Sequence, residues 1–338
     1  MKVITCETPG SFSFSDEPIP LRQADEALVK IQRIGICGTD IHAYAGCQPF
    51  FSYPRVLGHE LSGQIVEIDD NPYGLAVGDP VAIVPYLSCG TCIACRNGQP
   101  NCCIDINVLG VHSDGGMREY ISVPVASLIK NTTLNYNQLA MVECFAIGAH
   151  AVRRAKIREC EKVLIVGAGP IGLGLTQFAR QSGGDVAVMD IDDGRLVFAK
   201  DKLGIKHIIR ASKEDPMKRL EALTNGDFPV VIFDCTGNPS SMMDNFLYLA
   251  HGGRYILVSL VNANISFSDP EFHKRETTLL SSRNATKADF EWVIKSMENG
   301  EIIVEPLLTH YCHFDQIPDH FGNWSKPDGD VIKAIIEM

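Results

Sequence analysis

The sequence predicts an α/β fold with two parts, a β-rich domain and a doubly wound parallel sheet. Residues 1 to about 145 are rich in short β-like runs and turns, whereas later residues alternate apolar runs with helical spacers. A length of 338 residues suits two domains of roughly 150 residues each. We therefore place the first domain at 1–145, completed by 288–338, and the second at 146–287.

The β-rich domain is indicated by alternation and by turn residues. Apolar and polar side chains alternate over residues 29–32 and 63–68, as in strands with one buried face. A cluster of Glu and Pro at 17–20 is typical of a turn. The C-terminal residues are too few for a further domain, so the helix expected at 290–299 and the strand expected at 331–336 complete this one.

The second domain follows a helix predicted over 136–157. Beyond it lie short apolar runs with helical spacers between most of them, the pattern of a parallel sheet that is covered on both faces. The expected strands are residues 163–166, 186–189, 207–209, 230–233 and 255–258.

Charge and cysteine content narrow the partners and the location. The chain carries 41 Asp and Glu against 30 Lys and Arg, a formal charge of −11 that repels phosphate backbones and anionic lipids. We therefore expect a small-molecule substrate and neither nucleic acid nor membrane. The start has no apolar stretch typical of a signal peptide, and twelve cysteines favour a reducing compartment, so the expected location is the cytoplasm.

Four cysteines have the spacing of a structural zinc site. They are Cys89, Cys92, Cys95 and Cys103, separated by two, two and seven residues. Four thiolates close a tetrahedral shell around Zn²⁺ and leave no open position. Cys102 competes with Cys103 for the fourth place. Four unrelated buried cysteines are the alternative interpretation, which the spacing disfavours.

A glycine-rich motif indicates a dinucleotide site. Gly167, Gly169 and Gly172 form GxGxxG after the expected strand 163–166 and before a helical run. Such glycines let the backbone approach a pyrophosphate at a helix N-terminus. Asp190 ends the next strand, where an acid binds ribose hydroxyls and repels a 2′-phosphate, so we expect NAD rather than NADP. The alternative is a turn that serves helix packing only.

A third set of metal-binding side chains is dispersed along the first domain. Cys37, His59 and Glu60 supply one thiolate, one imidazole and one carboxylate. These donors suit a catalytic zinc that keeps one position open for substrate or water. Periodicity alone cannot bring them together, and a single Cys or His in a β-rich domain usually serves packing.

Together these motifs resemble the zinc-containing medium-chain dehydrogenase/reductase superfamily along essentially the whole chain. The resemblance is carried by GICGTDIH at 35–42, PRVLGHE at 54–60, the four-cysteine segment, DGGMREY at 114–120 and GAGPIG at 167–172. The chain resembles sorbitol and threonine dehydrogenases, and most of all the bacterial branch of starvation-sensing proteins and L-galactonate or L-gulonate 5-dehydrogenases. This implies a GroES-like catalytic domain followed by a Rossmann NAD-binding domain.

The resemblance also implies one catalytic and one structural Zn²⁺ in each subunit. Family spacing favours Cys103 over Cys102 in the structural site. Relatives commonly carry proline after the last acidic ligand, where this chain has Cys144, a residue that either approaches the metal or packs as a small hydrophobe. The implied catalytic ligands are Cys37, His59, Glu60 and Glu143.

The implied activity is oxidation of a secondary alcohol of a sugar acid or polyol to the ketone, with hydride transfer to NAD. Thr39 and His42 would relay the alcohol proton to water, and Glu60 belongs to the same catalytic set. The alternatives are a threonine- or sorbitol-type dehydrogenase and, from another class, a non-catalytic NAD-binding regulatory protein. The expected cofactor contacts are Gly167, Gly169, Pro170, Ile171, Gly172, Asp190, Arg195, Thr236 and Val258.

Substrate choice and assembly follow from the same resemblance. Phe50, His112 and Arg283 match loops that border the family's active site. The Arg283 guanidinium is suited to bind a sugar-acid carboxylate, with a purely structural arginine as the alternative. Family members usually form homodimers or homotetramers, and we expect the apolar segment 255–262 to pair across a two-fold axis.

Overall fold

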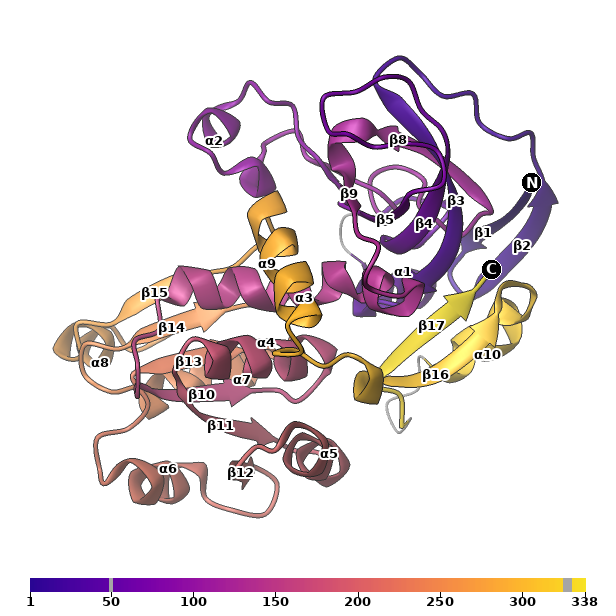
Figure 1. The fold of residues 1–338 in the computed structure, drawn as a ribbon. Coiled ribbons are helices and arrows are strands. Elements are labelled where there is room, and N and C mark those ends of the chain that lie inside the picture. Colours follow the sequence, from indigo (N-terminus) through magenta and orange to yellow (C-terminus); the bar gives the residue numbers. More distant parts are fainter. Residues whose placement is uncertain (49–50, 325–329) are drawn as a thin grey trace. The chain divides into compact units, whose positions relative to one another are not determined.

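The computed structural model describes residues 1–48, 51–324 and 330–338. The chain folds into two compact units (Figure 1). The first comprises Met1–Ala146 and Ala285–Met338, and the second comprises Ile147–Asn284. Their boundaries differ by one to three residues from those expected at 145, 287 and 288.

The first unit is built on a mostly antiparallel sheet of seven strands, in which β8 (Tyr120–Pro124) pairs with β3 (Glu26–Gly35) and the other strands follow one another in a single row. Two separate pairs accompany it, β1 (Lys2–Thr8) with β2 (Ser11–Asp16), and β6 (Tyr86–Leu87) with β7 (Asn107–Val108). The strand order is β16 (Leu308–His313), β17 (Lys333–Glu337), β3 (Glu26–Gly35), β4 (Glu60–Glu67), β5 (Pro80–Ile83) and β9 (Leu128–Lys130).

The helices of this unit connect its strands. In α9, Thr286 and Asp289 form a capping box, in which the Thr286 N–H donates to the Asp289 carboxylate at 2.8 Å. Every helix in the described ranges is too short or too polar to span a membrane. The helices are α1 (Gly38–Tyr44), α2 (Ile93–Arg96), α9 (Lys287–Glu298), α10 (Ile317–Trp324) and α3 (Tyr136–Ala155), which continues into the second unit.

The core of the first unit confirms the alternation read from the sequence. On β3, Val29 and Ile31 are fully buried while Lys30 between them is exposed. Each such buried aliphatic side chain contributes about 1.5–3 kcal/mol to stability. The C-terminal strand β17 pairs with β3, so the last residues complete this unit, as Figure 1 shows for the yellow segment.

The second unit holds one parallel sheet of six strands surrounded by helices (Figure 1). Its order corresponds to 3-2-1-4-5-6, so the winding reverses beside β10, where open sheets of this kind bind dinucleotides. The order is β12 (His207–Arg210), β11 (Asp185–Asp190), β10 (Lys162–Val166), β13 (Val231–Asp234), β14 (Arg254–Leu257) and β15 (Thr278–Ser281). The helices are α4 (Pro170–Gln181), α5 (Asp193–Leu203), α6 (Pro216–Thr224), α7 (Pro239–Asp244) and α8 (Asp269–Lys274).

One expectation about this sheet is wrong for residues 255–257. Strand β14, which begins the segment 255–262 expected to pair across a two-fold, is already hydrogen-bonded to β13 and β15. An internal strand has no free edge to offer another chain. The edge strand next to β14 is β15, which the sequence does not signal because it has four residues, none of them buried.

Candidate active site and metal centres

Cys37, His59 and Glu60 meet in the first unit, where their ligand atoms lie within 4.8 Å of one another. The pairing of β3 with β4 explains this, because Gly35 lies opposite Glu60 in the antiparallel register. Cys37 follows the end of β3 by two residues, and His59 immediately precedes β4. The sheet therefore brings together side chains that are 22 residues apart (59 − 37) in the sequence.

Glu60 lies at the centre of this cluster and is fully buried. Its Oε1 accepts from the ammonium of Lys333, which is also buried and lies on β17. Its Oε2 has no hydrogen-bond donor within the described part of the chain. A Cβ at Gly35 would overlap this oxygen, so the position opposite Glu60 requires glycine.

Asp40 fixes the segments that carry the thiol and the imidazole. Its buried carboxylate accepts from the N–H groups of Cys37 at 2.9 Å and Gly58 at 3.2 Å. One oxygen also lies 3.5 Å from Nδ1 of His59. Burial by itself lowers the pKa of His59, but the charges of Asp40 and Cys37 raise that pKa well above its ordinary value. The pocket therefore favours a positive charge, which a bound cation supplies in place of the proton.

The donor set fits a zinc ion with an open position. A thiolate, an imidazole and a carboxylate are preferred zinc ligands, and three protein ligands leave room for a fourth, exchangeable one. The unpartnered Oε2 of Glu60 is the kind of buried polar atom that a metal satisfies. We take this cluster as the candidate catalytic metal centre.

Glu143 lies outside this set of mutually close ligand atoms. It is buried on α3, and its carboxylate accepts a hydrogen bond from the hydroxyl of Tyr86. Burial raises the pKa of Glu143 to about 7, and the charges of His59 and Glu60 act on it in opposite senses. Its assignment as a ligand remains a prediction. The adjacent thiol of Cys144 is buried and also lies outside the cluster.

The expected proton relay lies on the helix that starts at the cluster. Thr39 and His42 are both on α1, three residues apart and therefore on one face. Thr39 is half-buried, whereas His42 is exposed. Thr39 is two residues from Cys37 in the sequence and His42 reaches the surface, so their role as a relay to water stays a prediction.

The four cysteines of the second cluster form a compact lobe. Their sulfur atoms lie within 4.8 Å of one another, and Cys102 is not among them. The Cys92 N–H donates to Sγ of Cys89 at 3.4 Å, and the Cys89 N–H donates to Sγ of Cys103 at 3.3 Å. Hydrogen bonds from backbone N–H groups, including that of Thr91, lower the pKa of Cys89 to about 6. This geometry suits a closed structural zinc site.

The glycine-rich turn of the second unit joins β10 to α4. A Cβ at Gly172 would overlap the carbonyl oxygen of Gly167, so the close contact between turn and helix requires glycine. Asp190 ends β11 and accepts from the N–H of Ala168 at 2.5 Å and of Asp192 at 2.9 Å. The acid is thereby held against the turn, as a ribose-binding carboxylate should be.

The other expected cofactor residues also lie in the second unit. Gly169 precedes α4. A guanidinium nitrogen of Arg195 lies 3.8 Å from the position that a Cβ atom at Gly169 would occupy. Thr236 follows β13, and both its N–H and its hydroxyl donate to buried Asp234. Val258 follows β14 and donates its N–H to the Asp234 carbonyl. Pro170 and Ile171 form the first turn of α4.

The structure describes two of the three expected substrate residues. Phe50 lies outside the described residues. His112 is an exposed residue of the first unit, and its Nδ1 accepts from the N–H of Val108 at 3.0 Å. Arg283 is exposed in the second unit, two residues after the end of β15. Their role in substrate binding stays a prediction.

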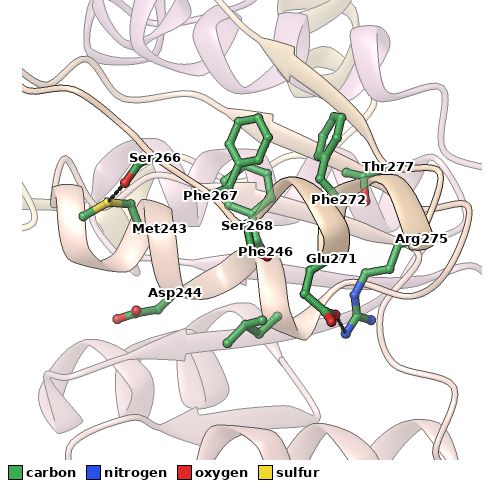
Figure 2. A pocket seen from close by; sticks show the side chains of 11 residues that line it. Met243, Asp244, Phe246, Ser266, Phe267, Ser268, Glu271, Phe272, Arg275 and Thr277 are labelled. Carbon is green, nitrogen blue, oxygen red and sulfur yellow. Dashed lines mark hydrogen bonds and ion pairs between the residues drawn. The ribbon is translucent and has the colours of Figure 1, made fainter.

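The second unit contains a cavity of about 390 Å³ that is separate from these residues (Figure 2). Three aromatic rings line it, and the Phe267 ring is tilted against those of Phe246 and Phe272 at centroid distances of 4.9 and 4.7 Å. Arg275 and Glu271 form an ion pair at its edge. None of the metal-binding side chains or glycines discussed above lines this cavity, so it is not the candidate active site.

Comparison with known proteins identifies the family. The pattern for an alcohol dehydrogenase GroES-like domain matches residues 23–133, and the pattern for a zinc-binding dehydrogenase matches residues 170–299. This chain belongs to the zinc-type alcohol dehydrogenase family. The fold class and the superfamily resemblance expected from the sequence are thereby confirmed, as is its classification as an oxidoreductase.

Relatives of this dehydrogenase match it over nearly their whole length. L-galactonate-5-dehydrogenase of Escherichia coli K12 is 43% identical over 336 residues, which is 99% of this chain and 98% of that protein. Starvation-sensing protein RspB of the same strain is 35% identical and covers 99% of each chain. A crystal structure of RspB from E. coli CFT073 with NADH has a TM-score of 0.93 at 32% identity, covering 100% of this dehydrogenase and 99% of that chain.

Three residues of the candidate site escape sequence reasoning. Asp40 is signalled in part, because an acid three residues after a helix N-cap is a capping-box pattern. Tyr86 and Lys333 carry no local signal, since each reaches the site only through strand pairing and tertiary packing. The buried acid Asp234 of the second unit is likewise visible only in the fold.

Proposed function

We propose that this dehydrogenase oxidises a secondary hydroxyl of a sugar acid, L-galactonate or a close relative, to the ketone with NAD. The observation that carries the reaction is the cluster of Cys37, His59 and Glu60, in which one carboxylate oxygen of Glu60 has no hydrogen-bond donor among the described residues. The substrate class is supported by the 43% identity to L-galactonate-5-dehydrogenase over nearly the full length.

Cys37, His59 and Glu60 would hold the catalytic zinc. Asp40 orients the thiol and imidazole segments through its hydrogen bonds, and Lys333 balances the buried charge of Glu60. The chemistry supplied by the bound groups is polarisation of the hydroxyl by the cation and acceptance of hydride by the nicotinamide. The chain itself provides binding, orientation and a path for the proton.

The proton of the substrate hydroxyl leaves through α1. Thr39 passes it from the half-buried end of the path, and the exposed imidazole of His42 delivers it to water. An imidazole suits this step because its ordinary pKa lies near neutral pH.

Residues of the second unit would bind NAD at the turn between β10 and α4. The glycines admit the pyrophosphate, and Asp190 at the end of β11 binds the adenosine ribose. The same carboxylate repels a 2′-phosphate and therefore favours NAD over NADP. A relative of this chain, RspB, has been crystallised with NADH.

Arg283 is proposed to bind the carboxylate of the sugar acid. A planar guanidinium forms two parallel hydrogen bonds with a carboxylate, which lysine cannot reproduce. Arg283→Lys should raise KM for L-galactonate by about tenfold and leave KM for the neutral polyol sorbitol nearly unchanged. An equal loss for both substrates would contradict the carboxylate role.

The test of the proposed function is NAD reduction by the zinc-loaded full chain, followed at the NADH absorbance. L-galactonate, L-gulonate, sorbitol, galactitol and L-threonine are compared, with Cys37→Ala as the matched control for activity that does not depend on the metal. We expect the highest kcat/KM with L-galactonate or L-gulonate.

Other outcomes of this panel identify the rivals. Preference for L-threonine or sorbitol would assign the chain to those dehydrogenases, to whose Bacillus members it is 30% and 32% identical. No NADH from any alcohol would favour an NAD-binding regulatory protein and would overturn the proposal.

We further propose a cytoplasmic homodimer or homotetramer. The edge strand β15 offers unpaired backbone groups for antiparallel pairing with a second copy. Twelve cysteines, eight of them outside the four-cysteine lobe, favour a reducing compartment. Light scattering should give a mass that is two or four times 37.1 kDa, and a monomer at all concentrations would contradict the assembly.

A further inference from the structure

Tyr86 contacts both the four-cysteine lobe and the buried acid Glu143 in the first unit. It is the first residue of β6, which pairs with β7, and it precedes Cys89 by three residues. Its ring packs against the small apolar core of the lobe, which contains Cys92 and Cys103. Its hydroxyl donates to the carboxylate of Glu143 on α3. One side chain therefore contacts both the lobe and a buried acid of α3.

The Tyr86 ring has little freedom to reorient. Phe290 of α9 meets it edge-on, with the centroids 6.2 Å apart and the ring planes at 80°. In the strand pair, Tyr86 lies opposite Val108, a buried member of the lobe core. Because the backbone and the ring of Tyr86 are both fixed by the lobe and α9, the direction of its hydroxyl depends on the lobe being ordered.

Glu143 lies outside the close set of ligand atoms of the dispersed cluster. The charges of His59 and Glu60 nevertheless act in opposite senses on the pKa of its buried carboxylate. A carboxylate at this position attracts a divalent cation bound by the cluster, whether it ligates the cation or stays one shell away. The hydrogen bond from Tyr86 holds that carboxylate in place.

We propose that Tyr86 is a positioning residue through which the four-cysteine lobe controls metal binding at the Cys37–His59–Glu60 cluster. Zinc bound in the lobe orders Tyr86, and the hydrogen bond from Tyr86 keeps the carboxylate of Glu143 in place. That carboxylate then raises the zinc affinity of the Cys37–His59–Glu60 cluster. The effect is reciprocal, because coupling between two binding sites acts equally in both directions. This inference rests on the proposed function in one respect, namely that both clusters bind zinc.

The test measures zinc affinity rather than dehydrogenase activity. Wild type, Tyr86→Phe, Cys95→Ser and the double variant are dialysed as full chains against a series of zinc buffers, and bound zinc is measured. Cys37→Ala serves as the reference that binds zinc at the lobe only. Tyr73→Phe, which removes a tyrosine hydroxyl from an exposed residue of the same unit, is the matched control.

We expect Tyr86→Phe to weaken zinc binding at the Cys37 cluster by about tenfold, the size typical for a residue that supports a metal ligand. Cys95→Ser should also weaken zinc binding at the Cys37 cluster. The double variant should bind zinc there no more weakly than the more affected single variant. Tyr73→Phe should stay within about twofold of wild type.

Two results would overturn the link alone. One is an affinity of Tyr86→Phe that equals the wild-type value, and the other is multiplication of the Tyr86→Phe and Cys95→Ser effects in the double variant. If Cys95→Ser does not fold, the reciprocal measurement decides. Zinc bound at the Cys37 cluster must raise the zinc affinity of the lobe in wild type and must fail to raise it in Tyr86→Phe. Zinc absent from the Cys37 cluster of wild type would instead remove the proposed function.

Discussion

The four-cysteine lobe and the Cys37 cluster are built in opposite ways, although both lie in the first unit. The lobe takes its ligands from residues 89–103, and backbone N–H groups from the same segment hydrogen-bond to its sulfurs. The Cys37 cluster takes its residues from the end of β3 and the start of β4, and its supports Asp40 and Lys333 come from α1 and β17. The ligand set of the lobe is formed by one short segment of the chain. The ligand set of the Cys37 cluster is formed only when the strands of the sheet pair.

This difference matches the two kinds of chemistry. A structural metal needs only a closed shell, which a short loop with tight turns can form by itself. A catalytic metal needs an open position and neighbours that set charge and orientation, and these must come from several elements. Substitutions at the Cys37 cluster should therefore affect mainly the activity, whereas substitutions at the lobe should affect mainly the local order of that segment.

The largest expected effect comes from removing the thiol of the dispersed cluster. Cys37→Ala should lose one zinc per chain and lower kcat/KM by a factor on the order of 10³ or more, because metal polarisation of the hydroxyl contributes several kcal/mol. The lobe should keep its zinc. Metal analysis and NADH formation check both points, and retention of two zinc ions would contradict the assignment.

Lys333→Met should affect stability next most strongly. Removing one partner of a buried ion pair leaves Glu60 uncompensated and costs about 3–5 kcal/mol of unfolding free energy. Lys333→Arg keeps the charge and should lose less. Urea unfolding of zinc-free and zinc-loaded protein separates the cases, because a bound cation compensates Glu60. A loss that is the same with and without zinc would show that Glu60 does not contact the metal.

Asp40→Asn should have a moderate effect confined to the dispersed cluster. The amide keeps the size of the side chain but weakens its acceptance from Cys37 and Gly58 and its attraction to His59. Zinc affinity at this cluster should fall by about 10–100-fold, with the lobe unaffected. Dialysis against zinc buffers measures both, and equal losses at the two clusters would indicate general destabilisation instead.

The smallest effect is expected at the neighbour of the lobe's last ligand. Cys102→Ser should keep both zinc ions, whereas the matched variant Cys103→Ser should lose the zinc of the lobe, because only Cys103 lies within ligand distance of the other sulfurs. Zinc content after purification distinguishes the two variants. Loss of the lobe zinc from Cys102→Ser but not from Cys103→Ser would show that Cys102 is the fourth ligand instead of Cys103.

The sequence predicts these regions to different extents for the same physical reason. The spacing of the four cysteines and of the glycines around Gly169 is local, so both sites are visible without a fold. Only the family motifs indicate the dispersed ligands, because their approach depends on the register that places Gly35 opposite Glu60. Tyr86 and Lys333 act through contacts that no local pattern encodes.

Secondary structure shows the same division. The helix expected over 136–157 corresponds to Tyr136–Ala155, because its apolar periodicity extends over many turns. The sequence does not predict strand β15, since four half-exposed or exposed residues give no periodic signal and become a strand only by pairing with β14. Without β15, the segment 255–262 is the last strand that the sequence predicts and therefore looks like the sheet edge.

The most direct test of the account is a crystal structure of the full chain grown with zinc, with anomalous diffraction recorded at the zinc edge. We expect two peaks per chain, one among the four cysteine sulfurs and one bound by Cys37, His59 and Glu60. A single peak at the lobe, or a second ion bound without Cys37, would contradict the assignment of the catalytic metal centre.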